Sequence, residues 1–304
     1  MPSITEFYAI NRPVPFKNVQ VNVDNCFFVD PHAVRLSQPA EPYASEAVEC
    51  MDSFLREVTA CVFEGSPESL QRAETLLQQF AEPWETRLGL ATSGFAGHGG
   101  AHDVGTWILD TLTSDAEALV RVGILRHLEY LPLFVHGVDR DITSDITTRL
   151  IFGALARFTE DMLLQYPELS TAPHEIKTFK KQVWNAAALE WDIEEFTLPV
   201  ANGKALVLVP DSWVRKTLLM SATRFFETSA LSFAQLAGAV VTDDGKLLKT
   251  PKDKLVGRPG LERGRNTNLR LTLQAFENEE DLLRQFTLFV ASRLEPNQVR
   301  ARAA

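Results

Sequence analysis

The stretch EEFTLPVANGKALVLVP, Glu194 to Pro210, decides the fold class of this chain. It holds two β-rich runs on either side of Asn202-Gly203, a dipeptide that strongly favours a two-residue hairpin turn. The stretch therefore predicts a β-hairpin over about 195–209. A second β-rich stretch, VQVNVDNCFFVDP, runs from Val19 to Pro31 around Asp24-Asn25 and predicts a hairpin or a bent strand over about 19–31.

Most of the remaining chain carries apolar residues at helical spacing. Gly65-Ser66-Pro67 separates the first two predicted helices, and Asp211 or Ser212 is a candidate N-cap for the last. The class is therefore α+β, predominantly helical with a small antiparallel sheet or hairpins. We expect one large domain, 1–304, or a division into 1–190 and 191–304. The predicted helices cover 45–63, 68–80, 104–125 with a break near Ser114, 143–165, 176–187 and 211–237.

Composition places the chain among ordinary globular proteins. It has 304 residues, 45% of them hydrophobic and 23% charged, and a net charge of −10, which argues against a whole surface made for polyanions. No apolar run reaches the roughly 18 residues that a membrane span needs, and the N-terminus lacks the pattern of a signal peptide. Cys26, Cys50 and Cys61 have no metal-binding spacing and predict reduced core thiols. We expect a cytoplasmic protein that does not contact membranes.

The segment TSGFAGHGGAHDVGTW, Thr92 to Trp107, is unusually rich in glycine. Backbone N–H groups in such a turn, at the start of a helix, form a site for phosphate. The candidate phosphate-binding residues are Gly94, Gly97, Gly99 and Gly100. A tight turn where helices cross, or a lid, is the structural alternative.

Known glycine motifs do not fit this segment. It has no GxxxxGK[ST], and it lacks the third glycine, the strand and the acidic ribose partner of a dinucleotide fold. His102-Asp103-Val104-Gly105 resembles the core of HD-domain phosphohydrolases, where adjacent His and Asp bind a divalent metal. Members of that family need another His some tens of residues upstream of the adjacent His and Asp. In this chain, the nearest His before His98 is His32. A looser metal site could use His98, His102 or Asp103.

The second candidate site is HGVDRDITSDITTRL, His136 to Leu150, which brings Asp139, Asp141 and Asp145 to the start of a helix. Asp141 and Asp145 are four residues apart and share a helical face. Carboxylates arranged in this way hold Mg²⁺ or Mn²⁺ in phosphoryl chemistry. Alternatively, Asp141 caps the helix and Asp145 complements its dipole.

Two further motifs resemble parts of nucleic-acid enzymes. Glu175-Ile176-Lys177 has the ExK spacing of restriction-type nucleases, which present both residues from a strand. The helical spacing of 176–187 instead turns the two charges about 200° apart, as on a solvated helix. The segment from Lys246 to Arg270 carries eight basic and two acidic residues, so it could follow phosphates or meet an acidic protein partner. Its candidate nucleic-acid contacts are Lys252, Lys254, Arg263 and Arg265.

Two function classes follow. The first is a metal-dependent phosphoester hydrolase acting on nucleic acid or nucleotide, with Mg²⁺ or Mn²⁺ as the cofactor. Its metal ligands would be Asp139, Asp141, Asp145 and Asp103, with His98, His102 and Asp145 in catalytic roles. The second is a non-enzymatic subunit of a larger complex that uses 246–270 as an interaction surface. We also expect residues 94–103 and 139–145 to line one pocket.

Overall fold

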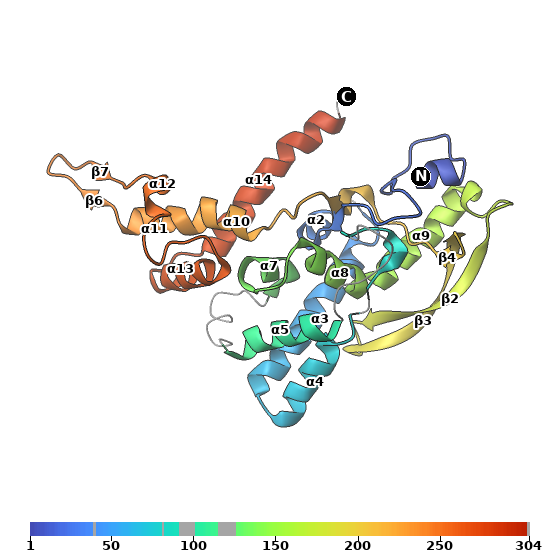
Figure 1. Cartoon of the computed structure of the whole chain (residues 1–304), viewed down its shortest axis with the longest axis horizontal. Helices are drawn as coiled ribbons and strands as arrows, with labels where there is room; N and C mark the ends of the chain where they lie inside the picture. The colour runs from blue at the N-terminus through green and yellow to red at the C-terminus, as the bar shows by residue number, and fades with distance from the viewer. Residues whose placement is uncertain (39–40, 81, 91–100, 115–125, 303–304) are drawn as a thin grey trace. The chain divides into compact units, whose positions relative to one another are not determined.

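The structure is a computed structural model, and it describes residues 1–38, 41–80, 82–90, 101–114 and 126–302 (Figure 1). The side chains of 101–104, 107, 111, 114 and 295–302 lie outside the description. About 52% of the chain is helical and 14% is strand, in small antiparallel sheets. The α+β class, dominated by helix, is thereby confirmed.

The chain divides into two compact units. Unit 1 consists of 1–114, 126–129 and 137–218, and unit 2 consists of 115–125, 130–136 and 219–304. The division at 218/219 differs from the predicted alternative at 190/191, because the strand that follows residue 190 pairs with a strand that precedes it.

Unit 1 is built on helices whose ends follow from local sequence. The helix over 44–64 ends at Gly65, whose φ of 67° is the left-handed conformation that favours glycine, and the next helix starts at the N-cap Ser66. The two predicted helices and the break between them are confirmed. The predicted helix over 143–165 is two helices that divide at Ile151. The helices of unit 1 are α1 (Ile4–Phe7), α2 (Pro31–Leu36), α3 (Ala44–Glu64), α4 (Pro67–Leu77), α5 (Ala101–Ser114), α8 (Arg140–Leu150) and α9 (Phe152–Gln165).

The predicted hairpin at Asn202-Gly203 is also confirmed. β3 (Glu190–Ala201) turns into β4 (Lys204–Ala205) through these two residues, with φ values of 53° and 74°. Positive φ at both central positions defines the turn that suits the twist of a hairpin. Beyond β4, the apolar run 206–209 is fully buried and forms part of the core.

The predicted helix over 176–187 is wrong. These residues form β2 (Ile176–Asn185), which pairs antiparallel with β3 over ten positions (Figure 1). Trp184 lies opposite Trp191, and the ring of Trp184 packs edge to face with Trp191 and with Phe54 of α3. The apolar residues Ile176, Phe179 and Val183 have helical spacing, and pairing with β3 overrides this local pattern.

Two other sequence predictions need correction in unit 1. The stretch 19–31 is not a hairpin, because β1 (Phe28–Val29) pairs with the distant β5 (Val214–Arg215). The predicted helix over 211–237 begins only at Ala222, since the 3₁₀ turn Asp211–Trp213 and β5 come first. In both cases a strand of two residues finds its partner far away in the sequence, which local patterns do not reveal.

Unit 2 is a second helical core. Phe134, Phe225 and Phe286 stack edge to face at its centre and are almost fully buried. A π-helical turn, Phe226–Ala230, joins two of its helices. The elements of unit 2 are α7 (Leu131–Phe134), α10 (Ala222–Phe225), α11 (Leu231–Ala237), β6 (Val240–Val241), β7 (Leu247–Leu248), α12 (Lys252–Leu255), α13 (Arg265–Glu277) and α14 (Leu282–Arg302).

Packing inside unit 1 explains why residue 105 is a glycine. A Cβ atom at this position would lie 2.5 Å from the carbonyl oxygen of Leu77, because α5 crosses the backbone at the end of α4 there. We expect Gly105→Ala to lower the free energy of unfolding by about 1–3 kcal/mol, as overpacking does, despite the better helix propensity of alanine. Urea unfolding measures this value.

Gly153 in α9 is the matched control. A Cβ atom there would meet the far end of the Arg157 side chain, 2.8 Å away, and that side chain has rotamers in which it moves aside. Gly153→Ala should therefore cost less than Gly105→Ala. Equal effects of the two substitutions would show that the α4–α5 crossing does not constrain residue 105.

Candidate functional site

The N-terminus of α8 uses Asp139 as its cap. The Oδ1 atom of Asp139 accepts hydrogen bonds from the backbone N–H groups of Asp141, at 3.0 Å, and Ile142, at 3.1 Å. The capping alternative named Asp141, and in the structure the cap is Asp139 instead. Two orphan amides of the helix are satisfied in this way, so Asp139 serves the helix.

Asp141 and Asp145 follow one turn apart on α8. Burial raises the pKa of Asp141, and the charge of Asp139 raises it further. Burial raises the pKa of Asp145 well above its ordinary value, and Asp141 is the largest of the charges that add to this shift. Within the described part of the chain, the buried Oδ1 atom of Asp141 has no hydrogen-bond partner. These two carboxylates repel each other in a partly desolvated place.

Two carboxylates that the sequence did not single out join them. Burial, followed by the charge of Glu82, raises the pKa of Asp24 to about 6, and Asp141 contributes to the same shift. Glu82 also raises the pKa values of Asp141 and Asp145. We call Asp24, Glu82, Asp141 and Asp145 the acidic cluster; its members come from three separate segments of unit 1. Clusters of carboxyl groups with perturbed pKa values are typical of functional sites.

The acidic cluster lies next to the residues that precede the glycine-rich segment. Gly89 has a φ of 141°, and a Cβ atom there would lie 3.5 Å from the Oδ1 atom of Asp141. The backbone of the next residue, Leu90, forms a hydrogen bond that favours the charged form of Asp141. Residues 91–100, with the candidates Gly94, Gly97, Gly99, Gly100 and His98, lie outside the described residues. His102 and Asp103 belong to α5, and nothing is described of their side chains. The predicted shared pocket stays a prediction.

In the described ranges, no three His, Cys, Asp or Glu side chains converge closely enough to hold a metal ion. Among the described members of the predicted ligand set, Asp139, Asp141 and Asp145 are thus not brought together as a cage, while the Asp103 side chain lies outside the described residues. Mg²⁺, however, commonly binds to one or two carboxylates and completes its shell with water and substrate phosphate. Asp141 and Asp145 fit that mode of binding.

Cationic groups border the acidic cluster. The charge of Arg149 opposes part of the rise in the pKa of Asp145. The guanidinium of Arg149 lies 3.8 Å from a carboxylate oxygen of the buried Glu85, and it donates to the backbone oxygen of Glu82. Lys181 forms the closer ion pair with Glu85, at 2.6 Å. Arg87 is 1% exposed, and its charge opposes part of the rise in the pKa of Asp24. It donates to three carbonyl oxygens, those of Val21, Trp84 and Ala205, and so ties three segments of the chain together.

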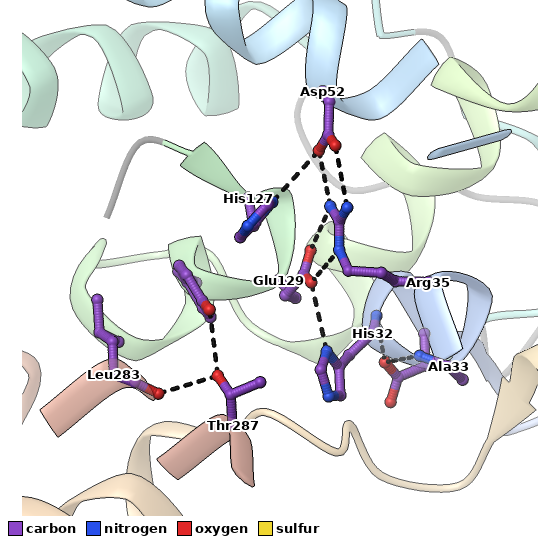
Figure 2. Close-up of polar contacts among 10 residues, drawn as sticks. His32, Ala33, Arg35, Asp52, His127, Glu129, Leu283 and Thr287 are labelled. Carbon is purple, nitrogen blue, oxygen red and sulfur yellow. Dashed lines mark hydrogen bonds and ion pairs between the residues drawn. The ribbon is translucent and has the colours of Figure 1, made fainter. Parts of the chain in front are cut away.

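A second charged group in unit 1 is shown in Figure 2. Arg35 of α2 donates to Glu129 from its Nε atom, at 2.6 Å, and to both oxygens of Asp52 of α3, at 2.9 and 2.7 Å. The Nδ1 atom of His32 lies 3.3 Å from Glu129, and the Nδ1 atom of His127 lies 3.4 Å from Asp52 (Figure 2). We call these five residues the Arg35 network. Its core is buried, since Glu129 is 1% exposed and His32 is 2% exposed.

No local pattern in the sequence indicated this network, because its members are spread over almost one hundred residues. Hydrogen bonds from His127 and Arg35 hold the pKa of Asp52 at about 2, against the opposing effect of burial. Hydrogen bonds and charge from His32 and Arg35 likewise hold the pKa of Glu129 at about 2. Both carboxylates are therefore ionised at neutral pH and are compensated by one guanidinium.

The lowered pKa values predict an acid-labile fold. Because the native state binds protons at Asp52 and Glu129 less tightly than the unfolded state does, their stabilising contribution is complete above about pH 4.5. It should be lost as the pH falls from there to about 2, at a cost of roughly 2–3 kcal/mol for Glu129. Urea unfolding at a series of pH values measures this loss.

Glu129→Gln tests the assignment, since it removes the titrating group. The stability of this variant should depend less steeply on pH in that range than the stability of the wild type. The control is Glu195→Gln, which removes an exposed carboxylate 3.6 Å from Lys180 and should leave the dependence unchanged. Identical pH profiles for all three proteins would refute the proposed role of Glu129.

The basic segment of unit 2 is largely engaged in internal contacts. Lys252 donates to the carbonyl oxygen of Glu227 and to Ser232, both at 2.7 Å, and Arg263 pairs with the Glu227 carboxylate at 2.8 Å. Arg265 donates to the carbonyl oxygen of Pro132. Lys254 is exposed. Three of the four predicted nucleic-acid contacts thus fasten the segment to neighbouring helices, which weakens the case for a phosphate-binding loop.

The remaining sequence motifs take structural places. Glu175 lies just before β2 and pairs with Lys177 at 2.9 Å, both well exposed, so the ExK charges face solvent on a strand rather than on a helix. The three cysteines are free thiols, but the prediction that all three lie in the core is wrong for Cys26. Cys50 and Cys61 are buried, whereas Cys26 is exposed, and burial raises the pKa of Cys50 to about 12.

No helix in the described part of the chain combines the length and apolar character of a membrane span.

The comparisons with known proteins point to one family. No curated protein and no solved structure matches the chain. Residues 11–221 match a family described as a domain of unknown function (DUF8370), and the match ends close to Leu218, where unit 1 ends. With more than half of its length matched, the chain belongs to the DUF8370 family.

Proposed function

We propose that the chain is a metal-dependent phosphoester hydrolase acting on nucleic acid or nucleotide, with the acidic cluster as its site. The observation that carries the proposal is the gathering of carboxylates from three segments beside Leu90, where the glycine-rich segment begins. A protein keeps carboxyl groups in mutual repulsion at a cost in stability, and such costs are typical of sites that bind a cation or transfer a proton.

In this proposal, Asp141 and Asp145 hold Mg²⁺ or Mn²⁺ together with water and the substrate phosphate. The bound cation would supply polarisation of the phosphate and a more acidic water. Arg149 balances part of the negative charge that remains. Amides of the glycine-rich segment would bind the phosphate, and His98 or His102 would act as ligand or general acid–base. The free thiols accord with a reducing compartment, and we place the protein in the cytoplasm.

The test is an activity assay on metal-free full-length protein. A nitrophenyl phosphate monoester, the corresponding diester and a single-stranded oligonucleotide are each incubated with Mg²⁺ or Mn²⁺. We expect hydrolysis of at least one substrate that depends on the metal and stops with a chelator. Because the described residues offer no three-ligand cage, calorimetry should detect weak Mn²⁺ binding that a nucleotide strengthens. Absence of both hydrolysis and metal binding would end the proposal.

We also propose a second function, a protein-interaction subunit, which depends on unit 2. The observation that favours it is a set of exposed apolar side chains on the β6–β7 hairpin, which leads into the basic segment. Val240, Val241, Leu247 and Leu248 are 63%, 66%, 49% and 65% exposed. Exposed apolar groups gathered in one place are typical of protein contacts. Site-specific crosslinking from this place tests the second function.

A further inference from the structure

Three cationic side chains gather around the ring of Trp84 in unit 1. The Nζ atoms of Lys181 and Lys204 lie 5.1 and 5.4 Å from the centroid of this ring, and the guanidinium carbon of Arg87 lies 5.4 Å from it. Cations at such distances are attracted by the ring of a tryptophan, which helps to hold them in place. Trp84 is half-buried and Lys204 is exposed, so a ligand in solution can reach this place. We call these four residues the Trp84 group.

The backbone segments that carry the Trp84 group are tied to one another. At the turn of the β3–β4 hairpin, just before Lys204, Asn202 donates to the side chain of Asn22. The side chain of Asn25 donates to the carbonyl oxygen of Arg87 at 2.9 Å. The loop before β1, the 3₁₀ turn that ends at Arg87 and the β3–β4 hairpin are thus held together.

The Trp84 group adjoins the acidic cluster at two places. Burial raises the pKa of Asp24, and the charge of Lys204 opposes part of that rise, so the two side chains lie close enough to interact. Lys181 forms its ion pair with the buried Glu85 at 2.6 Å, and Arg149, which borders the acidic cluster, faces the same carboxylate at 3.8 Å. Carboxylates that can hold a cation therefore lie next to ammonium groups that can hold an anion.

This arrangement fits the phosphate chain of a nucleotide together with Mg²⁺. In proteins, Mg²⁺ binds through one or two carboxylates and completes its shell with water and phosphate oxygens. The negative charge of the phosphates is matched by lysine and arginine, which form charge-assisted hydrogen bonds with phosphate oxygens. Two or three linked phosphates also match the small extent of the Trp84 group, whose three cations lie within 5.4 Å of one ring centroid.

A nucleic-acid backbone fits this place less well. Proteins that follow such a backbone carry cations along an extended groove, whereas the cations of the Trp84 group gather at one ring. The chain has a net charge of −10, and Lys252, Arg263 and Arg265 of the basic segment hold internal contacts. The charges therefore favour a small ligand with several phosphates over a polymer.

We propose that the Trp84 group is the phosphate subsite beside the acidic cluster and that it takes the di- or triphosphate chain of a free nucleotide. This inference rests on the proposed hydrolase function and narrows its substrate from nucleic acid or nucleotide to a nucleotide. Lys204, the exposed member of the group, donates to the phosphate oxygens. The more buried Lys181 and Arg87 add positive charge to the same place.

Calorimetry on the full-length protein in the presence of Mg²⁺ tests the subsite. The probes are methylenediphosphonate, β,γ-methylene ATP, AMP and a single-stranded oligonucleotide. We expect the two methylene-bridged ligands to bind, and AMP, which has one phosphate, to bind about tenfold more weakly or less. Equal affinities for the bridged ligands would show that the phosphate chain alone is recognised, and tighter binding of the ATP analogue would show that the nucleoside contributes.

Lys204→Ala should weaken the binding of both bridged ligands about tenfold at an unchanged melting temperature, because a charged hydrogen-bond donor is lost. Lys204→Arg keeps the charge and should keep most of the affinity. Lys180→Ala is the matched control, since Lys180 is next to Lys181 on β2, points to the opposite side of the strand and is 74% exposed. This variant should bind the bridged ligands as the wild type does.

The results separate the inference from the function on which it rests. Metal-dependent hydrolysis without binding of a bridged ligand, or with binding that Lys204→Ala leaves unchanged, overturns the subsite and leaves the hydrolase function standing. Tighter binding of the oligonucleotide than of the ATP analogue also overturns the inference. Binding that depends on Lys204, without hydrolysis of any ester or nucleotide, supports the subsite and overturns the hydrolase function. The absence of both binding and hydrolysis overturns both.

Discussion

Arg35→Met should lower the free energy of unfolding by about 3–5 kcal/mol. The guanidinium of Arg35 lies between the carboxylates of Glu129 and Asp52, and both pKa values are held at about 2. Without it, Glu129 is a buried charge that, among the described residues, keeps His32 as its ion-pair partner. Removal of one partner from a buried ion pair is costly because the remaining charge stays desolvated.

Urea unfolding of the wild type and of Arg35→Met measures this loss. Arg56→Met is the matched control, because Arg56 is 65% exposed and 3.6 Å from Glu49, so it should cost less than about 1 kcal/mol. Combining Arg35→Met with Glu129→Gln should recover part of the loss, since the double variant leaves no uncompensated charge at residue 129. If Arg35→Met were as mild as Arg56→Met, the network would contribute nothing to stability.

Asp145→Asn should reduce metal-dependent hydrolysis about 100-fold or more. The amide keeps the shape of the side chain but loses the charge that binds a cation and the proton that a carboxyl group exchanges. The same substitution should raise the melting temperature, because burial and neighbouring carboxylates raise the pKa of Asp145 and make its ionised form unfavourable. Loss of activity together with a gain of stability is the expected result.

Two variants separate this result from a structural role of α8. Asp139→Ala removes the cap and should cost about 0.5–2 kcal/mol while hydrolysis continues. Asp110→Asn changes an exposed aspartate on α5 and should alter neither property. Full activity of Asp145→Asn would remove Asp145 from the catalytic proposal, and a lower melting temperature would contradict the unfavourable charge.

Local signals in the sequence predicted the parts of the fold that local physics decides. Asn202-Gly203 predicted its turn because both residues tolerate positive φ, and Gly65 with Ser66 predicted a helix end and a helix start. The strand β2 was predicted as a helix because its apolar residues Ile176, Phe179 and Val183 have helical spacing. Pairing with β3 decides the matter, and the paired residues lie from 5 residues apart, at Asn185 and Glu190, to 23 residues apart, at Ile176 and Pro199.

The candidate site was predictable in part. The spacing of Asp141 and Asp145 placed two carboxylates on one face of a helix. Asp24 and Glu82 carried no such signal, because they reach the same place from other segments of unit 1. The Arg35 network was missed for the same reason: Arg35 and Glu129 are 94 residues apart. Charged side chains without local spacing become visible as a group only after the chain has folded.

The N-terminal residues of unit 1 have consequences for synthesis on the ribosome. Phe28 pairs with Arg215, the hydroxyl of Tyr8 donates to the carbonyl oxygen of Val200, and Arg87 joins Val21 to Ala205. The first thirty residues therefore leave the ribosome long before their partners exist. Side chains that are buried in the folded chain, such as those of Tyr8 and Phe28, stay exposed to water until residue 215 has emerged. Translation that stalls before that point would release a chain open to aggregation and to chaperones.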